Sequence, residues 1–267
     1  MDELLDVDWA AHWRALVEGR AASALVDGVP TGGQDPTYWS RRAARYQRNL
    51  SARPDPFLDV VLPWVHASST VLDVGAGFGR HAVPLAERAE WVTVVEPSEG
   101  MRARIPDLPN LTVIASDWLD AAVQPSSVVI CAHVLYGVLE PVPFIEKLEQ
   151  SAAERVFLAL RGGPNPHPTE RLLPRPRQPQ LGDCFNLLRQ LGIAPAVTWW
   201  RVPVQRRWGT LEEAVGECRE WLGARWDDES GRAWLAENLR PTDDGGLLFT
   251  DTDTMTGALH WRPGERG

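Results

Sequence analysis

Three glycines alternate with other residues in the segment Val71-Leu72-Asp73-Val74-Gly75-Ala76-Gly77-Phe78-Gly79-Arg80. Glycine turns where a side chain would be strained, and it lets the backbone approach a ligand closely. The apolar run before the glycines predicts a buried strand, and the residues after them predict a helix whose first N–H groups are free. The segment therefore predicts a loop that seats a nucleotide-sized cofactor, with a plain turn as the alternative.

The glycine spacing differs from the dinucleotide fingerprint, which requires glycine or alanine where this chain has Arg80. NAD and FAD are therefore disfavoured. The next predicted strand, 91–95, ends at Glu96, about 20 residues beyond the loop, where a carboxylate accepts hydrogen bonds from ribose hydroxyls. The alternative is an ordinary acid at a strand end. Further on, Asp117 can accept a hydrogen bond from an exocyclic amine, and Trp118 can flank a ring.

A regular succession of strands must position these residues. Short β-branched and apolar runs occur at 71–74, 91–95, 111–114, 127–133 and 155–160. Connections separate the runs, and the first of them reads as a helix, 80–88. This alternation predicts an α/β protein with a parallel, doubly wound sheet.

Residues 71–161 resemble the core of a class I S-adenosylmethionine-dependent methyltransferase of the small-molecule type. The segments that carry the resemblance are Val-Leu-Asp-Val-Gly-Ala-Gly-Phe-Gly at 71–79, Val-Val-Glu-Pro-Ser-Glu-Gly-Met at 94–101, Ala-Ser-Asp-Trp at 115–118 and Cys-Ala-His-Val-Leu-Tyr-Gly-Val at 131–138. Phe78 departs from the small or hydroxylated residue more usual there. The resemblance implies a Rossmann-like, seven-stranded sheet, mostly parallel, whose last strand, 247–261, inserts antiparallel beside the fifth.

The same resemblance implies a cofactor site for S-adenosylmethionine, with S-adenosylhomocysteine as product. The glycine loop would surround the methionine half, the acid after the second strand would bind the ribose, and 117–118 would hold the adenine. Helix 37–46 resembles a lid that closes over the cofactor. The implied cofactor-binding residues are Tyr38, Tyr46, Asp73, Gly75, Ala76, Gly77, Glu96, Pro97, Met101, Asp117, Trp118, Ala132 and His133.

The chemistry of this cofactor limits what the protein must do. A sulfonium methyl is already activated, so the protein mainly aligns a nucleophile and excludes water. A general base is needed only when the acceptor must lose a proton. His133 and Tyr136 are the candidates for that base or for positioning the substrate, and His81 is a weaker one. The alternative for His133 is a hydrogen-bonded structural histidine.

Helical segments flank the predicted core. We predict helices at 9–18, 37–46, 183–191, 210–222 and 227–239, the last two capped by Thr210 and Asp227, and a sixth strand at 196–206. We therefore predict an N-terminal helical lid, 1–54; a cofactor-binding α/β core, 55–207; a helical insertion that caps the substrate, 208–245; and a last strand completing the sheet, 246–267.

Composition excludes several classes of protein. The 267 residues are 44% hydrophobic and carry a formal charge of −9, which disfavours general nucleic-acid binding. No apolar run approaches the ~20 residues that span a bilayer, and no signal peptide is evident, so we expect a cytoplasmic protein with no membrane association. Three scattered cysteines suggest neither disulfides nor zinc, and Cys131-x-His133 lacks further ligands, so no metal is predicted. The oligomeric state stays open.

Two features bear on the methyl acceptor. Between Arg161 and Arg207 there are eight arginines, which form either a solvated loop or a rim that attracts an anionic substrate through Arg171, Arg175 and Arg177. Eleven of the thirteen tryptophans lie outside 71–161, and we expect most of them to serve packing and some to line a substrate pocket.

The function predicted from the sequence is methyl transfer from S-adenosylmethionine to a small molecule. The fourth strand is not followed by Asn/Asp-Pro-Pro-Tyr, which disfavours methylation of nucleobase amino groups. Two alternatives remain: aminopropyl transfer on the same fold, and a non-catalytic binding or scaffold protein. The acceptor and the methylated atom are not predicted.

Overall fold

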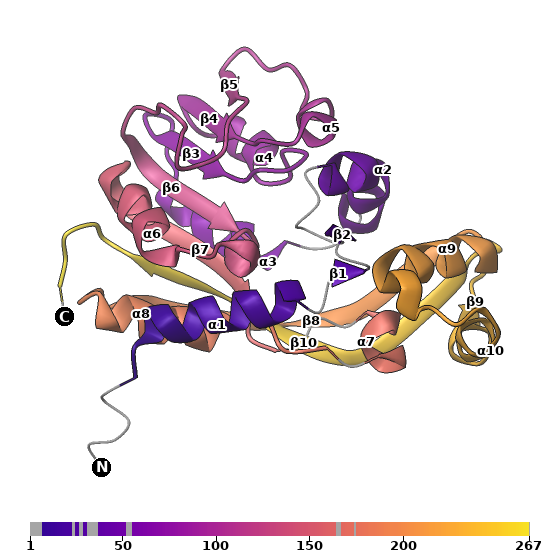
Figure 1. Ribbon diagram of the computed structural model, residues 1–267. Coiled ribbons are helices and arrows are strands. Elements are labelled where there is room, and N and C mark those ends of the chain that lie inside the picture. The colour runs from indigo at the N-terminus through magenta and orange to yellow at the C-terminus, as the bar shows by residue number, and fades with distance from the viewer. Residues whose placement is uncertain are drawn as a thin grey trace.

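The computed structural model describes residues 7–22, 25–26, 29–30, 37–51, 55–163, 167–173 and 175–266. Its centre is a mixed sheet with the strand order β5-β4-β3-β6-β7-β10-β8, in which β9 pairs with β10 (Figure 1). The strands are β3 (Thr70–Val74), β4 (Trp91–Val95), β5 (Leu111–Ile114), β6 (Ser126–Ala132), β7 (Ala152–Arg161), β8 (Ala196–Trp208), β9 (Arg240–Pro241) and β10 (Leu247–Trp261). A separate two-stranded sheet pairs β1 (Leu25–Val26) with β2 (Val29–Pro30).

The five strands from β5 to β7 are parallel, as the sequence predicts. Their carboxyl ends therefore meet at one edge of the sheet, where ligands bind in open α/β sheets. Residues that alternate along β6 enter different cores. Val129 faces one core and Ile130 the other, and both are fully buried. Burial on both faces explains why these strands read as nearly continuous apolar runs.

β10 runs antiparallel to both neighbours, β7 and β8, so the prediction of an antiparallel last strand is confirmed. The predicted count of seven strands is wrong, because β9 makes the described sheet eight-stranded. β9 pairs Arg240 with Leu248 and Pro241 with Leu247. A two-residue strand that includes a proline has no alternating pattern from which it could be recognised.

Helices cover both faces of the sheet. One core contains side chains from α1, α6 and α8, and the other contains side chains from α3 and α4. Trp13 of α1 is fully buried, and its indole N–H donates to the Val138 carbonyl at 2.9 Å. The core that contains side chains of α1, α6 and α8 is called the main core below. Helix α1, which belongs to the predicted lid 1–54, therefore packs in the main core. These helices are α1 (Trp9–Ala22), α3 (Pro56–Val61), α4 (Ala82–Ala86), α6 (Pro141–Gln150) and α8 (Leu181–Gln190).

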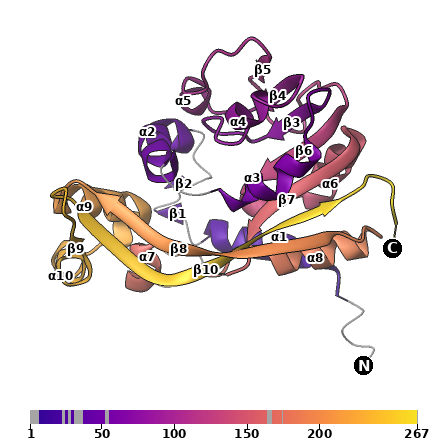
Figure 2. The same cartoon turned by 180° about the vertical axis from the view of Figure 1, so that it is seen from behind.

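β8 and β10 continue together beyond the parallel strands and carry a smaller core at their far end, as Figures 1 and 2 show from opposite sides. Trp208, Val215, Leu235 and Phe249 pack there, between this ribbon and the helices of the predicted insertion. The caps predicted for these helices are confirmed, because Thr210 accepts the Glu213 N–H and Asp227 the Ser230 N–H. The helices of this end are α7 (Pro168–Leu172), α9 (Leu211–Leu222) and α10 (Asp228–Asn238).

Two helices remain beside the carboxyl edge, α2 (Tyr38–Ser51) and α5 (Glu99–Arg102). In both views α2 lies between α5 and α9. Short 3₁₀ turns occur at Leu62–Trp64, Leu135–Gly137 and Gly223–Arg225. Among the helices described, none combines the length and the apolar character that crossing a membrane requires. The domain boundaries given above stay a prediction.

Candidate functional site

The glycine loop follows β3 at the carboxyl edge. Gly75, Gly77 and Gly79 have φ of +70°, +59° and +81°, a region that strains other residues. A Cβ at Gly75 would lie 2.4 Å from Val134 Cγ2, so close packing requires this glycine. A Cβ at Gly77 would meet only Met101 Sδ, at 3.9 Å. Gly77 therefore leaves room on its outer side for a ligand to approach the backbone.

Glu96 connects the end of β4 to this loop. Its Oε2 accepts the Gly77 N–H and its Oε1 accepts the Ser98 N–H, both at 2.8 Å. The side chain is buried, and desolvation raises the pKa of its carboxyl group above the usual value despite these hydrogen bonds. A carboxylate oxygen accepts two hydrogen bonds, so each oxygen keeps the capacity to accept one from a ligand hydroxyl.

Asp73, the residue before the last in β3, is 1% exposed. Neither of its carboxyl oxygens makes a hydrogen bond of good geometry within the described residues. Desolvation raises its pKa to about 6, although the nearby His81 and the Ala82 backbone N–H act in the opposite direction. Buried polar groups in native proteins are almost always paired, so a buried carboxyl group of this kind indicates a place for a ligand donor.

The two residues predicted to hold the adenine are adjacent in the loop after β5, but they have different surroundings. Asp117 is exposed at the sheet edge. Trp118 is 6% exposed, and its indole N–H donates to the Phe144 carbonyl at 3.2 Å while Lys147 Nζ lies 4.7 Å from the ring centroid. The structure therefore packs Trp118 in the main core and does not bring its ring to a predicted ligand-facing position.

Three further predicted contacts follow the loop. Met101 is buried beside Phe78, so the residue that departs from the usual pattern packs beneath α2. Pro97 is exposed after Glu96, whereas Ala132 is half-buried at the end of β6. Ala76 is buried within the loop itself.

Helix α2 is fixed to the loop by α5. Ser40 Oγ lies 3.0 Å from Ser98 Oγ and accepts the Gly100 N–H at 3.2 Å. A Cβ at Gly100 would lie only 2.6 Å from Ser40 Cα, so the two helices touch through their backbones. Tyr46 then meets Phe78 edge to face at 6.3 Å between ring centroids, which places it over the glycine loop.

Tyr38 lies toward the smaller core instead. It is buried, its hydroxyl accepts a hydrogen bond from Arg42 at 2.8 Å, and its ring meets Trp221 of α9 at 6.0 Å. Arg42 also pairs with Glu220 of α9 at 2.9 Å. Of the two predicted lid tyrosines, Tyr46 is therefore the one beside the glycine loop, and Tyr38 joins α2 to α9.

His133 and Tyr136 form a hydrogen-bonded pair at the end of β6. His133 Nδ1 lies 2.9 Å from Tyr136 Oη, which also accepts the Arg161 backbone N–H at 2.6 Å. His133 has φ of +61°, the one positive value at a non-glycine residue in the described part of the chain. Strained backbone of this kind clusters at functional sites.

Electrostatics keep both members of the pair neutral near pH 7. Desolvation by the surrounding protein and then the charge of Arg161 lower the pKa of His133, whose side chain is still accessible at the surface. Desolvation raises the pKa of Tyr136. His133 Nε2 has no hydrogen-bond partner among the residues described, so it is the ring atom available to a substrate.

The other predicted site residues, His81 and three arginines, bond to groups away from the His133–Tyr136 pair. His81 Nε2 lies 3.2 Å from Asp55 Oδ2, which indicates a structural role. The arginines of the predicted rim, Arg171, Arg175 and Arg177, bond to groups of the protein itself, although Arg171 and Arg177 are exposed. Arg171 pairs with Asp251, Arg177 pairs with Asp183 at 2.6 Å, and Arg175 donates to the Trp221 carbonyl.

Two arginines have surroundings that were not predicted: Arg161 lies beside the His133–Tyr136 pair, and Arg206 lies beside Glu217 of the smaller core. Arg161 ends β7 with its guanidinium carbon 4.0 Å from the Tyr136 ring centroid. Arg206 shares one face of β8 with the buried Val204 and Trp208, which its exposed neighbours Gln205 and Arg207 do not. That alternation was readable in the sequence and would have separated Arg206 from the solvent-facing arginines.

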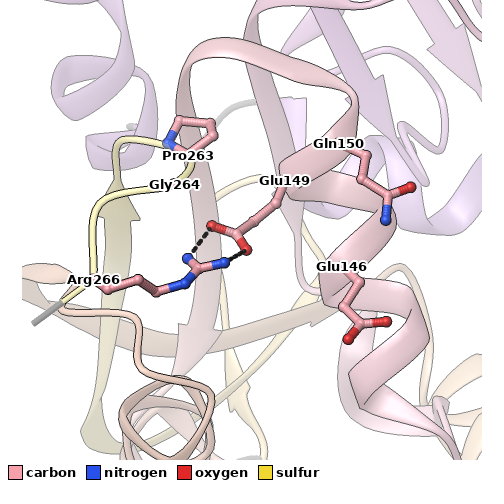
Figure 3. Close-up of a pocket in the computed structure, with 6 residues that line it drawn as sticks. All are labelled: Glu146, Glu149, Gln150, Pro263, Gly264 and Arg266. Atoms are coloured by element: carbon pink, nitrogen blue, oxygen red, sulfur yellow. Dashed lines mark hydrogen bonds and ion pairs between the residues drawn. The ribbon is translucent and has the colours of Figure 1, made fainter.

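A shallow depression lies away from this edge, between the end of α6 and the residues after β10 (Figure 3). Arg266 forms two hydrogen bonds of 3.0 Å with Glu149 across it. Its lining is exposed and mainly polar, so it offers no cofactor site. In the described residues, no three or more His, Cys, Asp and Glu side chains converge as metal ligands would.

Comparison with known proteins identifies the fold. No protein-family model matches the chain. An uncharacterised protein of Haemophilus influenzae is 31% identical over 132 residues, which cover 46% of this chain and 49% of that protein, so the match spans about half of each.

Solved structures resemble most of the chain. Magnesium protoporphyrin IX methyltransferase from Synechocystis with bound S-adenosylhomocysteine is 16% identical, with a TM-score of 0.51, over 84% of this chain and 95% of that one. The YcgJ protein of Bacillus subtilis is 13% identical, with a TM-score of 0.52, over 76% and 96%. The chain therefore has a Rossmann-like methyltransferase fold, as the resemblance of its motifs predicts.

Proposed function

We propose that this protein is a methyltransferase that uses S-adenosylmethionine to methylate a small molecule. The observation that carries the proposal is the junction of Gly77 and Glu96, where a buried carboxylate holds a glycine N–H and the glycine's outer side stays open. A fold shared with a methyltransferase that has the cofactor product bound supports the proposal.

Three carboxyl groups suit three parts of this cofactor. The buried Asp73 makes no hydrogen bond of good geometry within the described residues, so it would accept from the ammonium group of the methionine half. Glu96 would bind the ribose hydroxyls with its remaining acceptor capacity. Asp117, exposed after β5, would accept from the adenine amine. Gly75, Ala76 and Gly77 would form the backbone wall between them.

When bound, the cofactor supplies an activated methyl carbon, whose bond to sulfur breaks as its bond to the acceptor atom forms and sulfur keeps the electron pair. The residues of this chain then orient the acceptor. His133 Nε2 would hydrogen-bond the nucleophile, and Tyr136 would fix the imidazole through Nδ1. Because its pKa is lowered, His133 is a weak base, so its main role would be positioning.

The elements around the edge would complete the site. We propose that α2 covers the cofactor through Tyr46, and that the helices at 208–245 cover the acceptor. Arg42 and Glu220 join these two elements at 2.9 Å, so they would act as one cover.

Calorimetry tests the proposal against both alternatives. We expect saturable, one-to-one binding of S-adenosylmethionine and S-adenosylhomocysteine, and much weaker binding of decarboxylated S-adenosylmethionine. Tighter binding of the decarboxylated compound would indicate aminopropyl transfer. A folded protein that binds none of the three would be a scaffold, and the proposal would be wrong.

A further inference from the structure

Arg161 carries a positive charge that the described protein does not neutralise. No carboxylate within the described residues pairs with its guanidinium. Its neighbours are the Tyr136 ring, at 4.0 Å, and the neutral amide of Gln178, whose oxygen, when turned toward Arg161, accepts from Nε at 3.2 Å. An uncompensated guanidinium among protein atoms attracts an anion, and its planar fork fits carboxylate or phosphate oxygens.

Arg206, the other arginine of this region, differs from Arg161 because it has an acid beside it. Burial lowers the pKa of its guanidinium group, and the negative charge of Glu217 acts in the opposite direction. Glu217 lies 3.9 Å from Arg206 and also accepts from Trp208 Nε1 at 2.7 Å. Arg206 therefore has a counter-charge in the smaller core, whereas no carboxylate among the described residues pairs with Arg161.

The Arg161 charge lies beside the pair proposed to orient the acceptor. The Arg161 backbone N–H donates to Tyr136 Oη, which in turn contacts His133 Nδ1. An anion held by the Arg161 side chain would therefore lie within one residue of the atoms that contact the nucleophile. The chain as a whole has a formal charge of −9, so the positive charge of Arg161 is opposite to the net charge of the protein.

We propose that the methyl acceptor carries an anionic oxygen group, a carboxylate or a phosphate, which Arg161 binds beside Tyr136. The inference rests on the proposed methyltransferase function and names its substrate class. Arg171 and Arg177, tied to Asp251 and Asp183, have no part in it.

The test uses the whole chain saturated with S-adenosylhomocysteine and three small aromatic probes: benzoate, its neutral analogue of the same shape benzamide, and phenyl phosphate. Saturation-transfer NMR would measure their affinities. We expect at least one anion to bind about tenfold more tightly than benzamide, as one charge-assisted hydrogen bond warrants. The preferred anion identifies the oxygen group.

Variants then assign the site. Arg161→Gln should lose most of the anion preference and keep its affinity for S-adenosylhomocysteine, and Arg161→Lys should retain part of that preference. Arg207→Gln, which removes an exposed charge from β8, should behave as the unaltered protein.

Two results would overturn the inference. The first is that the unaltered protein binds benzamide and both anions with equal affinity. The second is that Arg161→Gln and Arg207→Gln lose the anion preference equally. Failure to bind S-adenosylhomocysteine at all would instead contradict the proposed function on which the inference rests.

Discussion

Single residues of the glycine loop combine unusual backbone with unusual burial. Gly77 has positive φ and an open outer side, and Asp73 is a buried carboxyl group without a hydrogen bond of good geometry in the described chain. The buried, unpaired carboxyl group lowers stability by itself. Both features become useful when a ligand supplies the missing contacts, which is typical of binding sites.

Gly77→Ala should separate backbone strain from ligand exclusion. Alanine at φ of +59° costs about 1 kcal/mol of folding free energy, and its methyl group would occupy the open side of the loop. We expect affinity for S-adenosylhomocysteine to fall about tenfold, equivalent to about 1.4 kcal/mol.

Gly245→Ala is the matched control, because Gly245 has φ of +81° and no atom near its Cβ position. It should lose similar stability in thermal unfolding and no affinity. Equal affinities of the two variants would show that Gly77 does not face the ligand.

Asp73 should make stability depend on pH. Its pKa in the fold, about 6, lies above the ordinary value of 3.8, so folding favours the protonated form. This stabilising contribution is complete below pH 4 and is lost as pH rises through 6. Asp73→Asn keeps a neutral side chain, so its stability relative to the unaltered protein should rise by about 2 kcal/mol between pH 4 and 7.

Urea unfolding across this pH range measures the difference. Asp117→Asn, at an exposed aspartate, should change stability by less than about 0.5 kcal/mol throughout. If the difference in stability between Asp73→Asn and the unaltered protein stays constant with pH, the pKa of Asp73 is not raised in the fold.

Among the elements, α2 packs against α5 through a close backbone contact. Gly100 lies against the Ser40 backbone with no space for a side chain. Gly100→Ala should therefore displace α2, at a cost of about 1–3 kcal/mol. Limited proteolysis should cut α2 faster in this variant than in Gly216→Ala, whose added Cβ meets nothing within 4 Å. Equal cleavage rates would mean that α2 does not rest on α5.

The elements also show what a sequence can predict. The parallel strands and the caps of α9 and α10 were predictable, because apolar runs and capping residues are local signals. The helix α6 was not predicted, and it opens with Pro141-Val142-Pro143 instead of a capping residue. The burial of Trp118 depends on Phe144 and Lys147, which are 26 and 29 residues away in sequence. Only the folded chain brings such residues together.

In the candidate site, motifs near the glycine loop were predictable and contacts across the sheet were not. Glu96 meets Gly77 as its motif implies. Arg161 meets Tyr136 because the neighbouring strands β6 and β7 end together. That relation depends on topology, which local spacing does not encode.

At the scale of the molecule, the smaller core has its own buried polar centre. Glu217 binds Trp208 Nε1 at 2.7 Å and lies 3.4 Å from His167 Nε2 and 3.9 Å from Arg206. Glu217→Gln should cost this region about 3 kcal/mol, because it removes a buried carboxylate that serves Trp208 and leaves the half-buried Arg206 without its counter-charge.

Hydrogen exchange should show faster exchange in α9 of the Glu217→Gln variant, with protection of β3 and β6 unchanged. Glu237→Gln, an exposed substitution in α10, is the control and should change neither region. Loss of protection throughout the sheet would show that the two cores unfold as one unit.

Calorimetry tests most directly whether this chain binds the cofactor through Glu96. It measures the affinity for S-adenosylhomocysteine of the unaltered protein, Glu96→Gln and Glu99→Gln. Thermal unfolding verifies that each sample is folded. Glu99 is exposed and lies three residues beyond Glu96, so Glu99→Gln removes the same charge as Glu96→Gln. We expect saturable binding by the unaltered protein and no change of affinity for Glu99→Gln. The affinity of Glu96→Gln should be at least about tenfold lower, as loss of hydrogen bonds to a charged group requires. Absence of saturable binding, or equal affinities of the two variants, would contradict this expectation.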